Sequence, residues 1–376
     1  VVYTAAVHPD NPEYACAVQK GLPMLTRAEL LGQIMRNYET PIAISGTHGK
    51  TTTTSMVSHI LLEGNCDPTI SVGGILPAIG GNIRVGESET FVTEACEYTN
   101  SFLSFFPKIS IILNIDADHL DFFKDIDDIR HSFRRFAQLL PADGTLIINA
   151  DTPRYEEIIR DLPCNVITYG LEQDADYQAG DITYDKYGHA SFSVLKVPGI
   201  HNVSNALAAI ALGHLLGLSE DVIIKGLGSF TGTDRRFQYK GQVAGVTIID
   251  DYAHHPTEIE ATLNAAHNYP HNKVWCVFQP HTYTRTKALL PEFAKALTLA
   301  DHVVVADIYA ARETDDLGIS SADLQKRIQE LGTPCEYFPT FDEIENFLLS
   351  NCQEGDLLIT MGAGDVVTIG EQLLGK

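Results

Sequence analysis

Short apolar runs rich in β-branched residues alternate along this chain with helix-like patterns, and this alternation constrains the fold more than any other feature. The runs span residues 41–45, 90–94, 108–114, 145–149, 246–252, 273–278, 302–307 and 356–361. Their apolar residues are continuous rather than alternating, which is typical of parallel strands buried on both faces. Between the runs, apolar residues recur every three or four positions, as in residues 126–140, and predict helices. We therefore expect an α/β protein with doubly wound, mostly parallel sheets.

The chain is longer than a single hydrophobic core usually supports, because 376 residues predict two or three domains. A polar stretch rich in Gly and Tyr at residues 169–197 interrupts the alternation, and it predicts antiparallel strands added to the central sheet. A helical pair at residues 201–227 follows, and the strand–helix pattern restarts after residues 228–238. We place boundaries near residues 40 and 233. The expected domains are residues 1–40, 41–233 and 234–376.

The first 40 residues are too few for a domain of the usual ~100–150 residues. Thr26 and Glu29 have the spacing of a capping box and predict a helix over residues 27–37. The chain opens on Val1, with neither Met nor a basic segment, so we expect it to be cut from a longer protein.

Charge and cysteine content narrow the classes of partner. Acidic residues outnumber basic ones 49 to 26, a formal charge of −23, which argues against a nucleic-acid or anionic-membrane partner. The 7 cysteines include no C-x-x-C pair, which favours reduced thiols in a cytoplasm over a disulfide framework or a zinc site. The longest apolar run, residues 109–115, is far shorter than the ~20 residues that span a bilayer.

A Gly-rich turn follows the first strand-like run of the expected central domain. The sequence Gly46-Thr47-His48-Gly49-Lys50-Thr51 keeps the end of the phosphate-loop signature G-x-x-x-x-G-K-[ST] but not its start. That leaves two interpretations, a shortened nucleotide loop or an ordinary turn ahead of a helix. Four consecutive threonines, from Thr51 to Thr54, favour the nucleotide loop. β-Branched residues open helices poorly, and a hydroxyl at this position suits Mg²⁺.

Polar residues follow the next strand-like runs, where ligands of parallel sheets gather. Glu94 ends the run at residues 90–94, although a solvated carboxylate is an equally simple interpretation. A cluster then follows residues 108–114, and it contains Asn114, Asp116, Asp118, His119 and Asp121. A single His in such a place is more often structural, but carboxylates with an imidazole also suit Mg²⁺. Together the three strand ends predict a metal–phosphate site.

The expected C-terminal domain carries three further groups. Arg235 and Arg236 are adjacent cations in an acidic chain, and guanidinium groups suit the charge of a transferring phosphoryl group. The sequence from Asp250 to Glu258 concentrates carboxylates, a Tyr and two His directly after a strand, which indicates a functional site. His281 and Arg285 end another strand and form a plausible clamp for a carboxylate.

The order of these motifs resembles that of the Mur ligases of peptidoglycan synthesis. The matching motifs are G-T-x-G-K-T-T-T, E-A-C-E, N-I-D-x-D-H-L-D, G-x-H-N-x-x-N-A, G-T-x-R-R-F, D-D-Y-A-H-H-P-T-E and F-Q-P-H-x-Y-x-R-T. The resemblance covers the chain from about Asn11 to its end. It implies a central ATPase domain, a Rossmann-like C-terminal domain, and a remnant, in residues 1–40, of an N-terminal domain that holds UDP.

The resemblance also implies the reaction, an ATP-dependent formation of an amide bond with Mg²⁺. The lactyl carboxylate of UDP-N-acetylmuramate attacks the γ-phosphate of ATP, and the amine of L-alanine then displaces phosphate from the acyl phosphate. Because most of the UDP-binding domain is missing, we expect the chain as given to bind Mg·ATP but to ligate poorly. Two alternatives stay open, a related ligase that adds a tripeptide and a non-catalytic nucleotide-binding module.

By the resemblance, Lys50 holds the β- and γ-phosphates, Thr51 (with Thr52) binds Mg²⁺, and Glu94 and His119 ligate a metal. Asn202 and Asn205 match the asparagines that meet adenine, Arg236 the arginine that reaches the γ-phosphate, and Asp251 the acid near the ribose. The expected nucleotide-binding residues are Gly46, Thr47, Gly49, Lys50, Thr51, Thr52, Asn114, Asn202, Asn205, Arg236 and Asp251.

The resemblance assigns Tyr252, His254, His281 and Arg285 to the alanine. His254 is a candidate general base, although an amine can also lose its proton to water or phosphate. Residue 282 is Thr where some relatives carry a second Arg, so we expect the amino-acid carboxylate to depend more on Arg285. The chain offers no obvious counterpart of the carbamylated lysine of other branches of the family.

Overall fold

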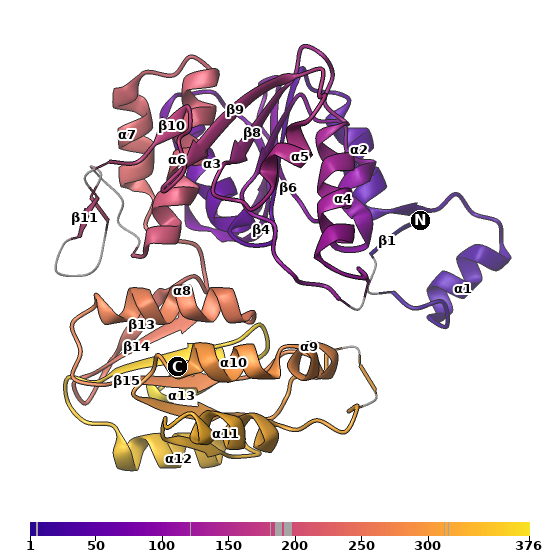
Figure 1. The fold of residues 1–376 in the computed structure, drawn as a ribbon. Helices are drawn as coiled ribbons and strands as arrows, with labels where there is room; N and C mark the ends of the chain where they lie inside the picture. Colours follow the sequence, from indigo (N-terminus) through magenta and orange to yellow (C-terminus); the bar gives the residue numbers. More distant parts are fainter. Residues whose placement is uncertain are drawn as a thin grey trace. The chain divides into compact units, whose positions relative to one another are not determined.

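Figure 1 shows the computed structural model, which describes residues 1–4, 7–120, 122–180, 182–184, 190–191, 198–311, 313–314 and 316–376. The chain divides into two compact units. The first contains Val1–Gly180 and Ser204–Phe230, and the second contains Asp181–Val203 and Thr231–Lys376. Each unit has a mostly parallel sheet, so the predicted α/β class is confirmed. The domain boundaries expected near residues 40 and 233 stay predictions.

The sheet of the first unit has the order β10-β9-β8-β7-β3-β6-β4-β5. Its strands are β3 (Thr40–Ser45), β4 (Thr69–Leu76), β5 (Gly81–Arg84), β6 (Thr90–Ala95), β7 (Ile109–Ile112), β8 (Thr145–Asn149), β9 (Asn165–Gly170) and β10 (Tyr177–Gln178). All neighbours are parallel except β4 and β5. Ile42 and Ile44 of β3 are fully buried, which accounts for the continuous apolar run that predicted this strand.

Helices cover both faces of this sheet (Figure 1). The helices of the unit are α1 (Pro12–Gln19), α2 (Arg27–Met35), α3 (Lys50–Glu63), α4 (Ile126–Ala137), α5 (Tyr155–Ile159), α6 (Ile200–Leu215, which enters the unit at Ser204) and α7 (Glu220–Ser229), with 3₁₀ segments η1 (Pro77–Ile79) and η2 (Tyr98–Ser104). Phe133 and Phe136 of α4 pack with Met35 of α2 and Ile158 of α5 into one core. α3 packs against α7 and against β4 and β6. The helix expected over residues 126–140 is confirmed.

The N-terminal segment adds a small sheet to the first unit. β1 (Val2–Tyr3) pairs in parallel with β2 (Leu25–Thr26), and α1 lies between them in the chain. Thr26 caps α2, and both hydrogen bonds of the predicted capping box with Glu29 are present. The helix expected over residues 27–37 is therefore confirmed, with its end at Met35.

The polar stretch of residues 169–197 differs from its prediction. β10 pairs with β9 in parallel, whereas β11 (Thr183–Tyr184) and β12 (Ala190–Ser191) form a separate antiparallel pair. The carboxylate of Asp151 accepts the N–H groups of Leu171, Glu172 and Gln173 and so holds the loop from which β10 starts. The expectation of antiparallel strands in the central sheet is therefore wrong for β10 to β12. Residues 181, 185–189 and 192–197 of this stretch lie outside the described residues.

The sheet of the second unit has the order β13-β14-β18-β15-β16-β17, with β13 antiparallel and the other strands parallel. Its strands are β13 (Gln238–Val243), β14 (Val246–Asp251), β15 (Val274–Phe278), β16 (His302–Val305), β17 (Cys335–Tyr337) and β18 (Leu357–Met361). Its helices are α8 (Pro256–His267), α9 (Tyr283–Ala288), α10 (Leu290–Leu297), α11 (Ser321–Glu330), α12 (Phe341–Asn351) and α13 (Val367–Leu373). The strands expected at β14, β15, β16 and β18 are confirmed.

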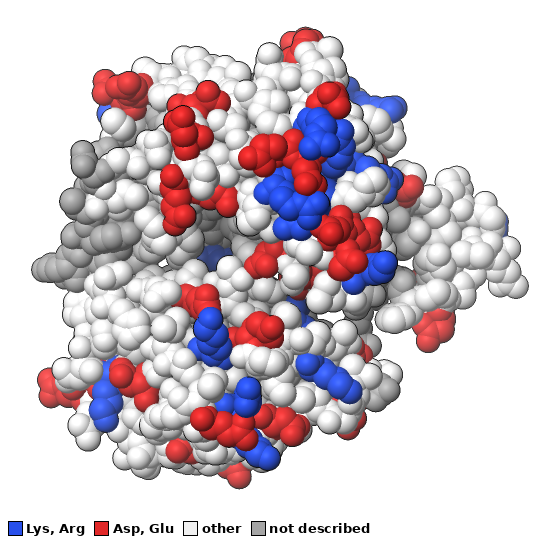
Figure 2. Space-filling model, in the orientation of Figure 1, with Lys and Arg blue, Asp and Glu red and all other residues white. Residues whose placement is uncertain are grey.

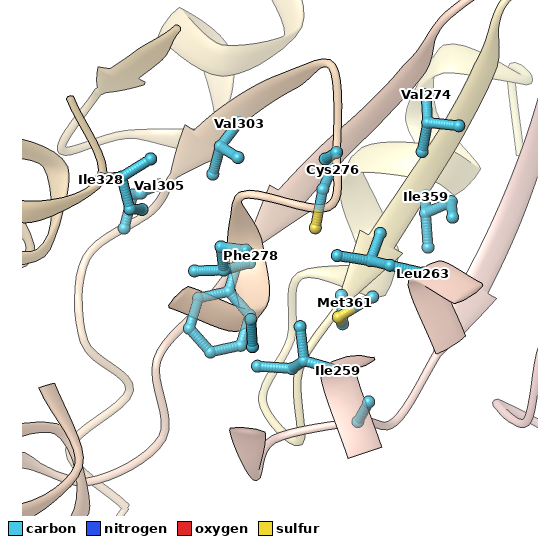
Figure 3. Close-up of a cluster of buried hydrophobic side chains, with 14 of the residues drawn as sticks. Ile259, Leu263, Val274, Cys276, Phe278, Val303, Val305, Ile328, Ile359 and Met361 are labelled. Atoms are coloured by element: carbon cyan, nitrogen blue, oxygen red, sulfur yellow. The ribbon is translucent and has the colours of Figure 1, made fainter. Parts of the chain in front are cut away.

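The second sheet has a hydrophobic core on each face. One core joins α8, α10 and α11 to the strands, and Figure 3 shows part of it, with Ile259 and Leu263 of α8 beside Phe278 and Met361. The other core contains residues of α12 and α13 together with Trp275. Helices on both faces make this unit doubly wound, as the sequence predicts.

Charged residues are mixed on the surface rather than segregated. Figure 2 shows basic and acidic side chains together over α4 and α5. Here Arg154 pairs with Asp127 and Glu157, and Arg130 also pairs with Asp127. In the part of the chain that the structure describes, no helix combines the length and the apolar character that crossing a membrane requires.

Candidate active-site residues

The Gly-rich turn connects the end of β3 to the start of α3. Gly46 and Gly49 have positive φ angles of 144° and 84°, which L side chains rarely adopt. A Cβ on Gly46 would lie 2.8 Å from the Cβ of Leu113, and one on Gly49 would lie 2.7 Å from Oδ1 of Asn205. Both glycines are therefore required by conformation and by space. Helix α3 begins at Lys50, so its N-terminal N–H groups lie at the turn, as in sites that bind phosphate.

Asn114 braces this turn from the end of β7. Its Oδ1 accepts the N–H of His48 at 2.7 Å, and its Nδ2 donates to the carbonyl of His48 at 3.0 Å. Thr47 donates its N–H to the carbonyl of Asn114 at 3.1 Å and, through Oγ1, accepts the N–H of Asp116 at 2.9 Å. These contacts make Asn114 and Thr47 supports of the turn. Their expected contact with nucleotide stays a prediction.

Lys50 folds back over the turn. Its Nζ donates to the carbonyl oxygens of Gly46 and Thr47, at 2.5 and 3.0 Å, and lies 2.9 Å from Oε2 of Glu97. Burial by itself would lower the pKa of Lys50, but the negative charges of Glu97 and Glu94 outweigh it and raise the pKa above its ordinary value. The ammonium group is thus charged and lies against two carbonyl oxygens of the turn and the carboxylate of Glu97.

Glu97 is a functional candidate that the sequence reasoning missed. Its side chain is only 2% exposed, and its Oε1 accepts no hydrogen bond from the described residues. That oxygen lies 3.8 Å from Nε2 of His119. A buried carboxylate oxygen without a donor is costly unless a cation or ligand meets it. The signal was available in the motif E-A-C-E, whose second carboxylate is Glu97.

Glu94 has a different environment from Glu97. Its Oε2 accepts the hydroxyl of Thr51 at 3.1 Å, and its Oε1 accepts the N–H of Gly73 at 2.5 Å. The structure therefore brings Glu94 to Thr51, and Glu97 to Lys50 and His119. Both carboxylates lie at the carboxyl end of β6, one before and one after its last residue, Ala95.

His119 adopts a left-handed backbone, with φ of 55°. Its ring is tilted by 31° against that of Tyr98, with centroids 4.5 Å apart, and its Nε2 lies 3.8 Å from Oδ2 of Asp118. An imidazole, a hydroxyl and a buried carboxylate oxygen without a hydrogen bond are donors that suit Mg²⁺. Glu97 and His119 therefore lie together as such donors would, whereas the hydroxyl of Thr51 lies beside Glu94. The expected ligation of a metal by Thr51, Glu94 and His119 stays a prediction.

Asn202 and Asn205 both lie in α6 and are both buried. Nδ2 of Asn202 donates to the carbonyl of Pro198 at 2.6 Å, while the amide of Asn205 faces Gly49. The structure thus brings Asn205 close to the Gly-rich turn. Their contact with adenine stays a prediction, as does any role of Thr52.

In the second unit, the structure separates the roles of the two adjacent arginines. Arg235 donates from Nε to Oδ2 of Asp250 at 3.0 Å, and from its two terminal nitrogens to the carbonyls of Gly364 and Gly362 at 3.0 and 2.7 Å. Arg235 therefore joins β14 to the loop after β18. The guanidinium carbons of Arg235 and Arg236 lie 4.9 and 5.3 Å from the centroid of the Tyr252 ring. Of the two cations considered from the sequence, Arg236 is the one not committed to Asp250.

Asp251 is buried, and it holds backbone on both sides of its carboxylate. Its Oδ2 accepts the N–H of Phe237 and its Oδ1 the N–H of Ala253, both at 2.7 Å. Burial raises the pKa of Asp251 to about 6, although the Arg236 charge and these two N–H groups act in the opposite direction. In this structure Asp251 organises the chain around Arg236 and Tyr252. The expected contact with ribose stays a prediction.

The residues expected around the amino acid lie together in the second unit. His254 lies with its ring 5.7 Å from that of His281 and 5.4 Å from that of Tyr252. Nδ1 of His254 lies 2.9 Å from the carbonyl of Tyr252 and 3.4 Å from Oε2 of Glu258. Nη1 of Arg285, on α9, lies 3.2 Å from Nδ1 of His281. Imidazoles, a phenol and a guanidinium can together bind a small zwitterion.

The fold and the Gly-rich turn define the class of this protein, an α/β enzyme whose turn has the form of a phosphate loop. Three family models match the chain: the "Mur ligase family, catalytic domain" over residues 1–39, the "Mur ligase middle domain" over residues 44–213, and the "Mur ligase, glutamate ligase domain" over residues 235–364. The chain belongs to the Mur ligase family. The predicted family and the predicted ATP-dependent amide-forming ligase are thereby confirmed.

Individual relatives are also similar. The UDP-N-acetylmuramate–L-alanine ligase of Agathobacter rectalis is 62% identical over 387 residues, an alignment that covers 100% of this chain and 84% of that protein. The crystal structure of UDP-N-acetylmuramate-alanine ligase MurC from Thermotoga maritima has a TM-score of 0.83 at 29% identity and covers 100% of this chain and 84% of that chain. A murein peptide ligase from Psychrobacter arcticus has a TM-score of 0.73 at 24% identity, with coverages of 98% and 84%, and shares the fold.

Proposed function

We propose that this protein is an enzyme that ligates L-alanine to UDP-N-acetylmuramate with ATP. The observation that carries the proposal is the group formed by Lys50, Glu97 and His119 at the Gly-rich turn. Its support is the 62% identity to the alanine ligase of Agathobacter rectalis over the whole chain. The reaction consumes ATP in a phosphoryl transfer from its γ-phosphate to the lactyl carboxylate. An acyl transfer to the amine of alanine follows.

In the first unit, the charged Lys50 and the N–H groups at the start of α3 bind the β- and γ-phosphates. Glu97 and His119 would hold Mg²⁺ together with Thr51 and Glu94, the hydroxyl and carboxylate that lie beside each other. When bound, the ion neutralises charge that develops on the transferring phosphoryl group. The carbonyls of Gly46 and Thr47 hold the ammonium group of Lys50, and contacts with phosphate replace these two contacts when the nucleotide binds. The lysine is therefore held in place before the nucleotide arrives.

In the second unit, Arg285 binds the carboxylate of alanine, and His281, His254 and Tyr252 surround its amino group. A bidentate guanidinium–carboxylate contact is among the stronger polar contacts available. Arg285→Ala should therefore raise the KM for alanine by about tenfold or more while changing the KM for ATP little. Equal changes in both KM values would place Arg285 at the nucleotide instead.

The decisive experiment compares Glu97→Gln with Glu94→Gln in the full-length enzyme. Glutamine keeps the shape of each side chain and its hydrogen bond to Lys50 or Thr51, but it removes the negative charge. We expect Glu97→Gln to lower phosphate release with UDP-N-acetylmuramate and L-alanine by ~10²-fold or more, and Glu94→Gln to have a smaller effect. A Glu97→Gln enzyme within a few-fold of the parent would contradict the proposed metal site.

The same assay with other amino acids and with a tripeptide tests the specificity. An enzyme that accepts only the tripeptide would support the tripeptide-adding alternative, and one that never turns over ATP would support the non-catalytic module. The family assignment favours neither. A cytoplasmic location, and the absence of nucleic-acid and membrane partners, stay predictions from the cysteines and the acidic composition.

A further inference from the structure

We infer that Glu313 is a positioning residue that sets the place of Arg285 by holding the start of α9. This inference rests on the proposed role of Arg285 in binding the amino-acid carboxylate. Oε2 of Glu313 accepts two consecutive backbone N–H groups, from Tyr283 at 2.5 Å and from Thr284 at 3.1 Å. These are the first two residues of α9, the short helix that carries Arg285.

The backbone before α9 needs support from outside the helix. Thr282 has φ of 67° and ψ of 142°, a conformation that a β-branched residue rarely adopts. Such a conformation persists only where neighbouring contacts enforce it. Oγ1 of Thr282 accepts the N–H of Arg285 at 3.4 Å, so the strained residue also caps the helix. A change at Thr282 would therefore be transmitted directly to the backbone of Arg285.

The supporting contacts come from the segment that follows β16. Tyr309 donates its N–H to the carbonyl of Pro280 at 2.8 Å and accepts the N–H of Thr282 at 2.9 Å. The rings of Tyr309 and His281 stack with centroids 5.6 Å apart. Glu313 follows in the same segment and adds its two hydrogen bonds one and two residues after Thr282. Backbone and carboxylate thus hold the chain on both sides of the strained residue.

The two N–H groups that Glu313 accepts are among those that a helix leaves without an intrahelical partner. A carboxylate there also suits the positive end of the helix dipole. Without Glu313 the start of α9 would lose both acceptors, and Thr282 could relax toward an ordinary conformation. The guanidinium of Arg285 would then lie away from His281, which is 3.2 Å from it in this structure.

The test is a double-mutant cycle in the full-length enzyme with Glu313→Ala and Arg285→Ala. We expect Glu313→Ala to raise the KM for L-alanine by about tenfold and to leave the KM for ATP within about twofold. In the Arg285→Ala background the same change should have no further effect on the KM for alanine, because both act through one contact. Additive effects of the two changes would overturn the inference.

Glu313→Gln distinguishes positioning from direct contact with the substrate. The amide oxygen of glutamine can still accept both N–H groups, so we expect this variant to keep a KM for alanine within about threefold of the parent. If Glu313→Gln is as impaired as Glu313→Ala, the charge itself binds the substrate and the inference is wrong. If Arg285→Ala leaves the KM for alanine unchanged, the proposed role of Arg285 fails first, and Glu313 loses the residue that it is inferred to position.

A matched control excludes a general loss of stability. Glu343 lies in the first turn of α12 in the same unit, where its carboxylate accepts the hydroxyl of Thr340 at 2.7 Å. Glu343→Ala removes a carboxylate at the start of α12, a helix that does not carry Arg285. We expect it to leave both KM values unchanged. A rise in the KM for alanine equal to that of Glu313→Ala would show that any weakened helix in this unit has the same effect.

Discussion

Burial of Asp251 makes the stability of the second unit depend on pH. The pKa of this carboxyl is raised from its ordinary value of 3.8 to about 6 in the folded protein. The folded state therefore binds more protons than the unfolded state between these values. Stability contributed by the protonated form is fully present below the unfolded pKa and is lost as the pH rises through about 6. The full difference between the two pKa values corresponds to about 3 kcal/mol in the free energy of unfolding. About 1.4 kcal/mol of this change occurs between about pH 7.5 and about pH 5.

Asp251→Asn removes the titration but keeps the size of the side chain. Asparagine has one carbonyl oxygen, whereas Asp251 accepts both Phe237 and Ala253, so one N–H of the backbone loses its acceptor. That loss costs about 1–3 kcal/mol at every pH. At about pH 7.5 this cost is offset, because the variant no longer buries a negative charge. We therefore expect the two proteins to be similar in stability there, and the variant to be weaker by a further 1.4 kcal/mol or so at about pH 5.

The only tryptophan, Trp275, makes this measurable for the second unit alone. It is 4% exposed in β15, and its Nε1 donates to Asp356 at 2.9 Å, so its fluorescence reports the unfolding of this sheet. The assay is urea unfolding of parent and variant across that pH range. Asp342→Asn, at an exposed carboxylate in the same unit, is the control. A difference between parent and Asp251→Asn that does not change with pH, or that grows as the pH rises, would refute the reasoning.

Three further predictions concern the two groups of site residues. Lys50→Met should lower ATP-dependent phosphate release by ~10²-fold or more, because the phosphates lose the positive charge that binds them while Glu97 keeps its negative charge. Activity within a few-fold of the parent would contradict this. Arg235→Met should lower the free energy of unfolding, followed by tryptophan fluorescence, by about 3–5 kcal/mol, since Asp250 is 0% exposed and would lose its charge partner. A decrease below about 1 kcal/mol would argue against a buried ion pair. Gly46→Ala should lower the thermal midpoint of the first unit, because φ there is 144°, and an unchanged midpoint would show that the turn can relax.

The sequence by itself was sufficient for the layout of the strands and for the nucleotide turn. Continuous apolar runs predict buried parallel strands, and β3, β7, β8 and β18 lie where those runs are. Gly46 and Gly49 can also be recognised from the sequence, because only glycine tolerates their backbone angles and their close neighbours. These features depend on local preferences and on periodicity, which a sequence records directly.

Only the tertiary structure decided which polar side chains face which partners. Glu94 and Glu97 are equivalent in the sequence, but β6 ends between them, and only Glu97 is buried beside Lys50 and His119. Arg235 and Arg236 are likewise adjacent, yet Arg235 is bound to Asp250 and to the loop after β18. Beyond a strand end no periodicity dictates where a side chain points. Burial and partner are then set by residues far away in the sequence.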